Sequence, residues 1–150
     1  MSFQVDEDSA LYAPAQEAAR RWSLALGIPV TSTADGTIPI FLTDTPSCPP
    51  PTIPLQPGDR VGGCSMDLGT PDARIEIPSS ILAGEWLTVL MHEMGHHLRG
   101  KEGQHVQEPG HLMSRGVNNG QDITPADVAF VCTPPSTSSD PDALDCHPPS

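Results

Sequence analysis

The sequence predicts a small α+β domain with a twisted sheet, two long helices and an irregular C-terminal part that ends in a shorter helix. Apolar residues recur at helical spacing over residues 85–99 and again over residues 14–26. Short segments rich in β-branched residues lie between these two stretches, and glycine, proline and turn residues separate them. A chain of 150 residues with only 4% aromatic residues can form one modest hydrophobic core.

The first helix is expected over residues 14–26. Pro14 suits the first helical position, and Gly27 suits the position just after the last helical turn. The apolar face of this helix would lie against the core. Residues 1–12 are acidic, and we expect them to be ordered only by contacts with the rest of the chain.

Two strands are expected next, over residues 28–33 and 37–43, with a turn at residues 34–36 between them. Residues 44–60 contain six prolines. Because proline lacks an amide hydrogen and fixes its own φ angle, that density excludes a helix or a central strand there.

The second half of the sheet is expected just before the longest helix. Residues 61–66 would form a short strand, and residues 73–77 alternate in polarity as a strand does. The helix over 85–99 follows, and Gly100 supplies a left-handed stop. The core-facing stripe of this helix comprises Leu87, Leu90, Met91, Met94 and Leu98.

The last element is a helix expected over residues 124–131. Thr124 is a suitable cap, Pro125 suits the first helical position, and Asp127 lies near the capping-box position. From residue 133 the chain is rich in proline and serine, and we expect no regular structure there.

Four cysteines, Cys48, Cys64, Cys132 and Cys146, fall into two pairs that are near in sequence. We predict the disulfides Cys48–Cys64 and Cys132–Cys146, each of which would stabilise the fold by about 3 kcal/mol. Disulfides persist in oxidising compartments, so we expect an extracellular or periplasmic protein.

The net charge of −12 at pH 7 restricts the partners. The chain has no basic stripe, which argues against nucleic acid as a partner, and an anionic membrane surface would repel it. No apolar run approaches the length of a membrane span.

One short motif carries chemistry: residues 92–96 read H-E-x-x-H within the predicted helix. His92 and His96 are four residues apart, so their imidazoles project from one face on successive turns. Two imidazoles in this arrangement can bind one Zn²⁺. The Glu93 carboxylate is suited to act as a general base on a water at the same metal.

A catalytic zinc site needs a third protein ligand and one open position. The candidates downstream of the helix are Glu102, His105, Glu108 and His111. Spacing alone leaves the choice among them open.

The stretch resembles the metzincin metalloproteases, whose pattern is H-E-x-x-H-x-x-G-x-x-H followed by a methionine turn. Arg99 stands at the glycine of that pattern and Glu102 at its third histidine. Residues 105–113, H-V-Q-E-P-G-H-L-M, are nevertheless similar to the matrixin segment from the third histidine to the turn methionine. The resemblance therefore implies a three-residue insertion before the third ligand, His105, with Met113 as the turn methionine.

The resemblance covers residues 85–131 well, and upstream only the order of the elements matches. It implies one catalytic domain, residues 1–150, with an N-terminal subdomain of about 1–99 and a C-terminal subdomain of about 100–150. The helix at 14–26 would back the sheet, and the helix at 85–99 would carry the active site.

By this resemblance we expect a secreted, monomeric zinc endopeptidase that acts on a peptide or protein substrate. Zn²⁺ held by His92, His96 and His105 would lower the pKa of a bound water. Glu93 would take its proton and then protonate the leaving amine. The substrate would pair in extended form with an exposed strand, for which residues 73–77 are the candidate.

Three alternatives remain at this point. A gluzincin-like peptidase would use Glu102 or Glu108 as the third ligand. A disulfide-stapled binding module would hold a structural zinc ion, and such a site has no need of Glu93. A peptidase that binds zinc without cleaving would result if the insertion misplaced His105.

Overall fold

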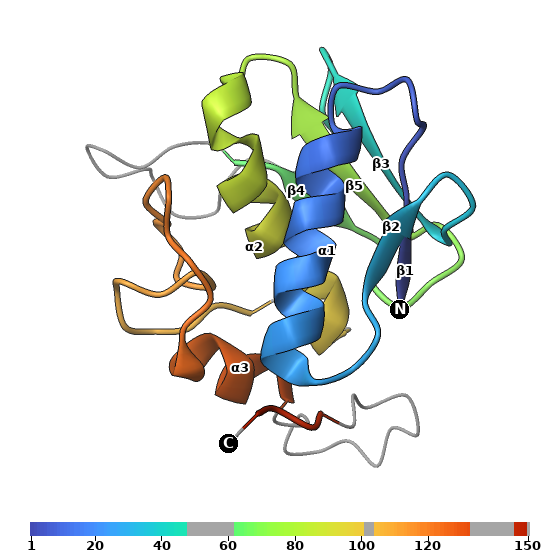
Figure 1. Cartoon of the computed structure of the whole chain (residues 1–150). Coiled ribbons are helices and arrows are strands. Elements are labelled where there is room, and N and C mark those ends of the chain that lie inside the picture. The colour runs from blue at the N-terminus through green and yellow to red at the C-terminus, as the bar shows by residue number, and fades with distance from the viewer. Residues whose placement is uncertain (48–61, 101–103, 133–145, 150) are drawn as a thin grey trace.

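The computed structural model describes residues 1–47, 62–100, 104–132 and 146–149. Within these residues the fold is α+β, with a five-stranded mixed sheet and three α-helices, so the coarse fold class is confirmed (Figure 1). The elements in chain order are β1 (Ser2–Gln4), α1 (Tyr12–Leu26), β2 (Thr31–Thr33), β3 (Ile38–Thr43), β4 (Cys64–Met66), β5 (Arg74–Pro78), the 3₁₀ turn η1 (Ala83–Glu85), α2 (Trp86–Arg99) and α3 (Pro125–Cys132).

The strand order in the sheet is β2-β1-β3-β5-β4. The pairs β1–β2, β1–β3 and β3–β5 are parallel, whereas β4 runs antiparallel to β5 and forms one edge. The register places Ile75 of β5 between Ile40 of β3 and Ser65 of β4. Strands β2 and β4 are therefore the two edges of the sheet within the described residues, and β4 is the edge next to β5.

Strand β1 corrects the expectation for the N-terminus. Residues 1–12 were expected to be ordered only by contacts, but Ser2–Gln4 form a strand that pairs on both sides. Phe3 in this strand is fully buried. A three-residue strand is too short to show the period-2 pattern, and its stability comes from pairing with segments distant in sequence.

Strand β5 corrects a second expectation. Residues 73–77 were the candidate for an exposed edge, but β5 is paired with β3 on one side and with β4 on the other. Glu76 is buried, and its carboxylate accepts hydrogen bonds from the Ser47 amide and the Arg74 guanidinium, each at 2.7 Å. The edge on this side of the sheet is β4, and the other edge is β2.

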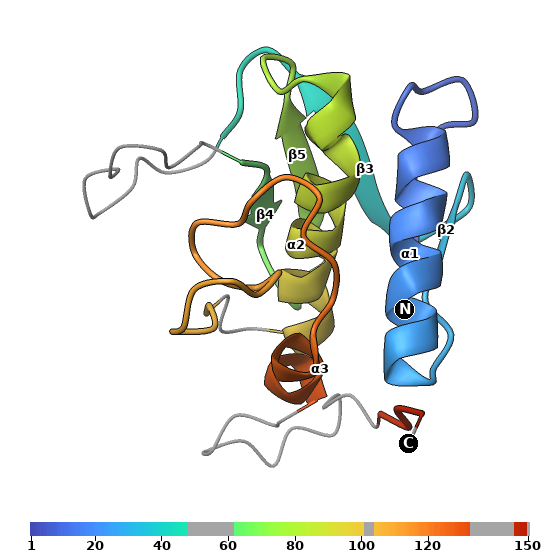
Figure 2. The same cartoon turned by 60° about the vertical axis from the view of Figure 1, so that its left-hand side comes forward.

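Helices α1 and α2 lie side by side on one face of the sheet (Figures 1 and 2). The buried Trp22 of α1 donates a hydrogen bond from its indole Nε1 to the Met91 carbonyl of α2 at 2.8 Å. His97 of α2 donates from Nε2 to the Arg74 carbonyl of β5 at 3.1 Å. These two bonds fix α2 to both α1 and the sheet.

The three helices begin and end within two residues of their predicted bounds. Of the expected strands, 37–43 and 73–77 are confirmed to within one residue, and 28–33 shortens to its last three residues. Of the strand expected at 61–66, the described residues 62–66 contain Cys64–Met66, and residue 61 lies outside the described residues. In the proline-rich segment, residues 44–47 contain no helix or strand, and residues 48–61 lie outside the described residues.

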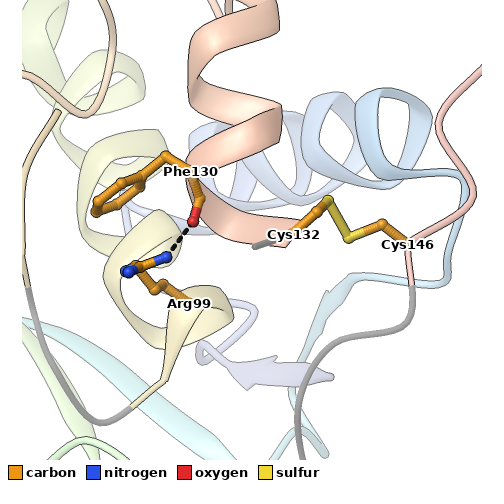
Figure 3. Close-up of a disulfide and its surroundings, with 4 residues drawn as sticks. All are labelled: Arg99, Phe130, Cys132 and Cys146. Carbon is orange, nitrogen blue, oxygen red and sulfur yellow. Dashed lines mark hydrogen bonds between the residues drawn. A yellow bond between two sulfur atoms is a disulfide. The ribbon is translucent and has the colours of Figure 1, made fainter. Parts of the chain in front are cut away.

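The C-terminal part contacts the end of α2 through Phe130 (Figure 3), and the His147 amide donates a hydrogen bond of 2.8 Å to the Leu26 carbonyl at the end of α1. The predicted disulfide Cys132–Cys146 is confirmed. The Arg99 guanidinium lies 4.3 Å from the centroid of the Phe130 ring and donates a hydrogen bond to the Phe130 carbonyl. Cys64 is disulfide-bonded, and Cys48, its expected partner, lies outside the described residues.

None of the helices in the described parts of the chain combines the length and the apolar character needed to cross a membrane.

Candidate functional site

The structure brings together the three histidines that the sequence singled out. His92 and His96 lie on α2, and His105 lies in the segment that follows it. One ligand nitrogen from each ring lies within 4.8 Å of the other two. The His105 ring centroid lies 5.3 Å from that of His92 and 4.8 Å from that of His96.

The tautomer of His92 follows from its hydrogen bond. Nδ1 lies 2.7 Å from the carbonyl oxygen of Leu112, and a carbonyl only accepts, so Nδ1 carries the proton. The unprotonated Nε2 of His92 then faces Nε2 of His96 at 3.1 Å. A histidine that donates its other N–H to a backbone carbonyl is the usual arrangement for a metal ligand.

The donor set fits a divalent metal ion such as Zn²⁺. Two imidazole nitrogens on one tetrahedral Zn²⁺ lie about 3.3 Å apart, because each Zn–N bond is about 2.0–2.1 Å. The two Nε2 atoms are already close to that separation. Unlike Nδ1 of His92, the buried Nδ1 of His96 has no hydrogen-bond partner among the described residues. The metal itself is not identified by this geometry, because imidazole also suits copper, iron and nickel.

Burial keeps these imidazoles neutral, which is the form that binds metal. Burial lowers the pKa of His92 to about 4, and it lowers the pKa of His96 well below the ordinary value. The pKa of His105 is also lowered, by burial and by the nearby positive charge of Arg115. Protons therefore compete little with a metal ion at these nitrogens at neutral pH.

Glu93 lies next to His92 on α2 and is enclosed by the edge strand. Its carboxylate Oε2 accepts a hydrogen bond of 2.6 Å from the Ser65 hydroxyl of β4. Burial raises the pKa of Glu93 to about 8, and the hydrogen bonds from Ser65 act in the opposite direction. A cation at the adjacent histidines would also favour the ionised carboxylate.

Met113 packs against the helix between the two histidines. It is fully buried, and a Cβ atom built on Gly95 would lie 2.3 Å from its sulfur and 2.9 Å from its methyl carbon. A side chain at position 95 would therefore require the buried Met113 side chain to move. Met113 therefore packs on α2 next to the residue that precedes His96.

Asp127 holds that turn and was not identified as a site residue from the sequence. Its two carboxylate oxygens accept hydrogen bonds from the amides of Leu112 and Met113, at 2.9 and 2.8 Å. The same carboxylate accepts the Thr124 amide at 2.8 Å, which makes the capping box predicted for α3. The sequence predicted only the capping role of Asp127, because its hydrogen bonds to residues 112 and 113 depend on the tertiary structure.

The other candidates for the third ligand do not join the cluster in the described residues. The Glu108 side chain is 83% exposed, and its carboxylate lies 3.9 Å from Nε2 of His111. His111 is hydrogen-bonded through Nδ1 to the Thr124 hydroxyl at 2.7 Å. Glu102 lies outside the described residues.

No model of a known protein family and no curated protein matches this chain.

Proposed function

We propose that this protein is a zinc endopeptidase of the metzincin type, minimal in size, with His92, His96 and His105 as the metal ligands. The observation that carries the proposal is that His105 joins the two helix histidines although the segment before it departs from the family spacing. The turn that contains Met113 also packs on the motif helix, as the resemblance implies.

The presence of Glu93 favours a catalytic site over a structural one. A structural zinc site is closed by four protein ligands, whereas the cluster within the described residues supplies three. Burying a carboxylate beside a metal ligand costs free energy, and a structural zinc site does not need one there. The position of Glu93 suits proton transfer, so the site supports a hydrolytic function better than it supports a structural zinc site in a binding module.

In this proposal the three histidines, Glu93 and Leu112 each have a defined role. A zinc ion held by the three histidines would supply Lewis acidity to a water and to a substrate carbonyl. Glu93 accepts the proton of the attacking water and delivers it to the leaving amine. Leu112, through its carbonyl, keeps His92 in the tautomer that presents Nε2.

Strand β4 is the proposed platform for the substrate. It lies at the edge of the sheet, and Ser65 in the same strand contacts Glu93. An extended peptide that adds to this edge would form backbone hydrogen bonds with β4 and bring its carbonyls toward the carboxylate. We therefore move the proposed substrate edge from residues 73–77 to Cys64–Met66.

Cleavage of an unfolded protein substrate tests the proposal. The wild type and Glu93→Ala are compared, with zinc content measured on both samples. We expect about one zinc ion per chain in both and cleavage by the wild type alone. Zinc without cleavage in the wild type would favour a binding module, and a wild type that binds no zinc would overturn the metal site itself.

A further inference from the structure

We propose that Ser65 is a positioning residue for Glu93, and that Gly63 together with the first two residues of the edge strand, Cys64 and Ser65, forms a cradle for its side chain. The inference rests on the proposed function, because it assigns Ser65 a role in the proton transfers of Glu93. It adds a residue that lies outside the H-E-x-x-H motif and 28 positions before Glu93.

The polar contact is a short hydrogen bond. Ser65 Oγ lies 2.6 Å from Oε2 of Glu93, within the range of a hydroxyl that donates to a carboxylate. The same hydroxyl lies 2.9 Å from the Glu93 carbonyl oxygen, so it stays beside this residue in either orientation. Within the described residues no other side chain is hydrogen-bonded to this carboxylate.

The second contact is steric and comes from Gly63. A Cβ atom built on Gly63 would lie 2.9 Å from Cγ of Glu93, 2.9 Å from Cδ1 of Ile77 and 3.1 Å from Cγ1 of Val89. The Glu93 stem therefore lies directly against the backbone at Gly63, the residue just before the edge strand. Ser65 restrains the end of the side chain, and Gly63 leaves the space in which its middle lies.

The cradle is placed by rigid elements on both sides. Ser65 is paired with Ile75 in the antiparallel β4–β5 ladder, which fixes its position relative to the sheet. Helix α2, which carries Glu93, is bound to the same strand β5 through His97. The distance between Ser65 and Glu93 is therefore set by the sheet and not by a loop.

A fixed carboxylate matters because glutamate has three rotatable side-chain bonds. Rotamer freedom must be lost before the proton transfer, and a misplacement of about 1 Å can cost a hundredfold in rate. If Ser65 holds Oε2, the other oxygen is available to the reacting water. The Ser65 hydroxyl is proposed to contact neither substrate nor metal, so its effect on the reaction rate comes through the position of Glu93.

The kinetic test compares the wild-type chain with Ser65→Ala, Ser65→Thr and Ser23→Ala, all zinc-loaded. Ser23 of α1 is the matched control, because its hydroxyl also donates a 2.6 Å hydrogen bond, which goes to the Ile28 carbonyl and not to Glu93. We expect Ser65→Ala to lower kcat by about 10–100-fold with KM and zinc content unchanged. Ser65→Thr, which keeps the hydroxyl, and Ser23→Ala should retain kcat within a few-fold.

A second measurement needs no catalysis. The Tm cost of Ser65→Ala is measured in the wild type and in the Glu93→Ala variant, as a double-mutant cycle. We expect Ser65→Ala to lower the Tm by about 2–4 °C when Glu93 is present, and by much less in the Glu93→Ala background. An equal cost in both backgrounds would overturn the cradle.

The outcomes separate this inference from the proposed function. An active wild type with an equally active Ser65→Ala variant would overturn the role of Ser65 and leave the peptidase intact. A loss in Ser65→Thr as large as in Ser65→Ala would overturn the assignment of the hydroxyl. A wild type without cleavage would overturn the proposed function, and the catalytic role of Ser65 would fall with it.

Discussion

Nδ1 of His92 lies 2.7 Å from the carbonyl oxygen of Leu112, twenty residues further along the chain. This bond connects the motif helix to the turn that contains Met113 and sets which nitrogen of His92 is available to a metal ion. Because the Leu112 amide is in turn bound by Asp127, the tautomer of His92 depends on a chain of contacts that reaches α3.

The first prediction concerns the third ligand. His105→Ala should weaken zinc binding by more than about a hundredfold, because loss of a ligand should exceed the effect of losing an outer-shell partner. His111→Ala is the matched control, since His111 lies in the same loop but binds Thr124. Competition with a chromophoric chelator measures both affinities. Equal affinities in the two variants would contradict His105 as a ligand.

Asp127 should matter for both stability and metal binding. In Asp127→Asn, the amide NH₂ cannot accept the backbone N–H of Leu112 or Met113, so one of these buried donors loses its partner. We expect a loss of about 2–3 kcal/mol in the free energy of unfolding, measured by urea denaturation, and about 10–100-fold weaker zinc binding. The exposed Asp72→Asn should change neither, and an unchanged zinc affinity in Asp127→Asn would contradict the role of the turn.

A side chain at position 95 should destabilise the fold. A Cβ atom there would overlap the Met113 sulfur, so Gly95→Ala should cost about 1–3 kcal/mol despite the better helix propensity of alanine. Gly84→Ala is the control, because nothing lies within 4 Å of a Cβ atom at that position. The cost should fall when Met113→Ala is added. A Gly95→Ala variant as stable as the wild type would show that this packing is not tight.

Glu76 should make the free energy of unfolding depend on pH in the acidic range. Burial raises the pKa of its carboxyl, but the Ser47 amide and the Arg74 guanidinium outweigh burial, so the pKa lies below the ordinary value. A carboxyl whose pKa is lower in the folded state stabilises the fold above its unfolded pKa, and the effect is lost as the pH falls through the folded value.

The Tm difference between the wild type and Glu76→Gln should therefore be largest near pH 7 and should shrink below about pH 4. Thermal unfolding followed by circular dichroism from pH 7 to pH 3 measures this. The exposed Glu7→Gln serves as the control for general effects of acid. A difference that stays constant over the whole range would contradict the assigned interaction.

The parts of this fold that follow local patterns could be predicted from the sequence. Helix α2 was predictable because its apolar residues repeat at helical spacing, and the four-residue separation of His92 and His96 then places both on one face. His105 could not be placed by periodicity, because it lies in an irregular segment, and the resemblance of residues 105–113 to the matrixin segment supplied it.

The remaining features depend on contacts between segments distant in sequence. Strand β1 is too short to show a period, and β5 became an interior strand only because β4 pairs beside it. Ser65 carries no motif, and its contact with Glu93 exists only once the sheet and α2 are packed together. Such pairings are not encoded in any local window of the sequence.

The most direct test of the central claim is the X-ray absorption spectrum of the zinc-loaded chain at the zinc edge. The proposal predicts three imidazole nitrogens and one oxygen from water, at about 2.0–2.1 Å, because His92, His96 and His105 leave one position open. A shell of sulfur atoms at about 2.3 Å from the zinc ion, or only two imidazole ligands, would contradict the three-histidine site.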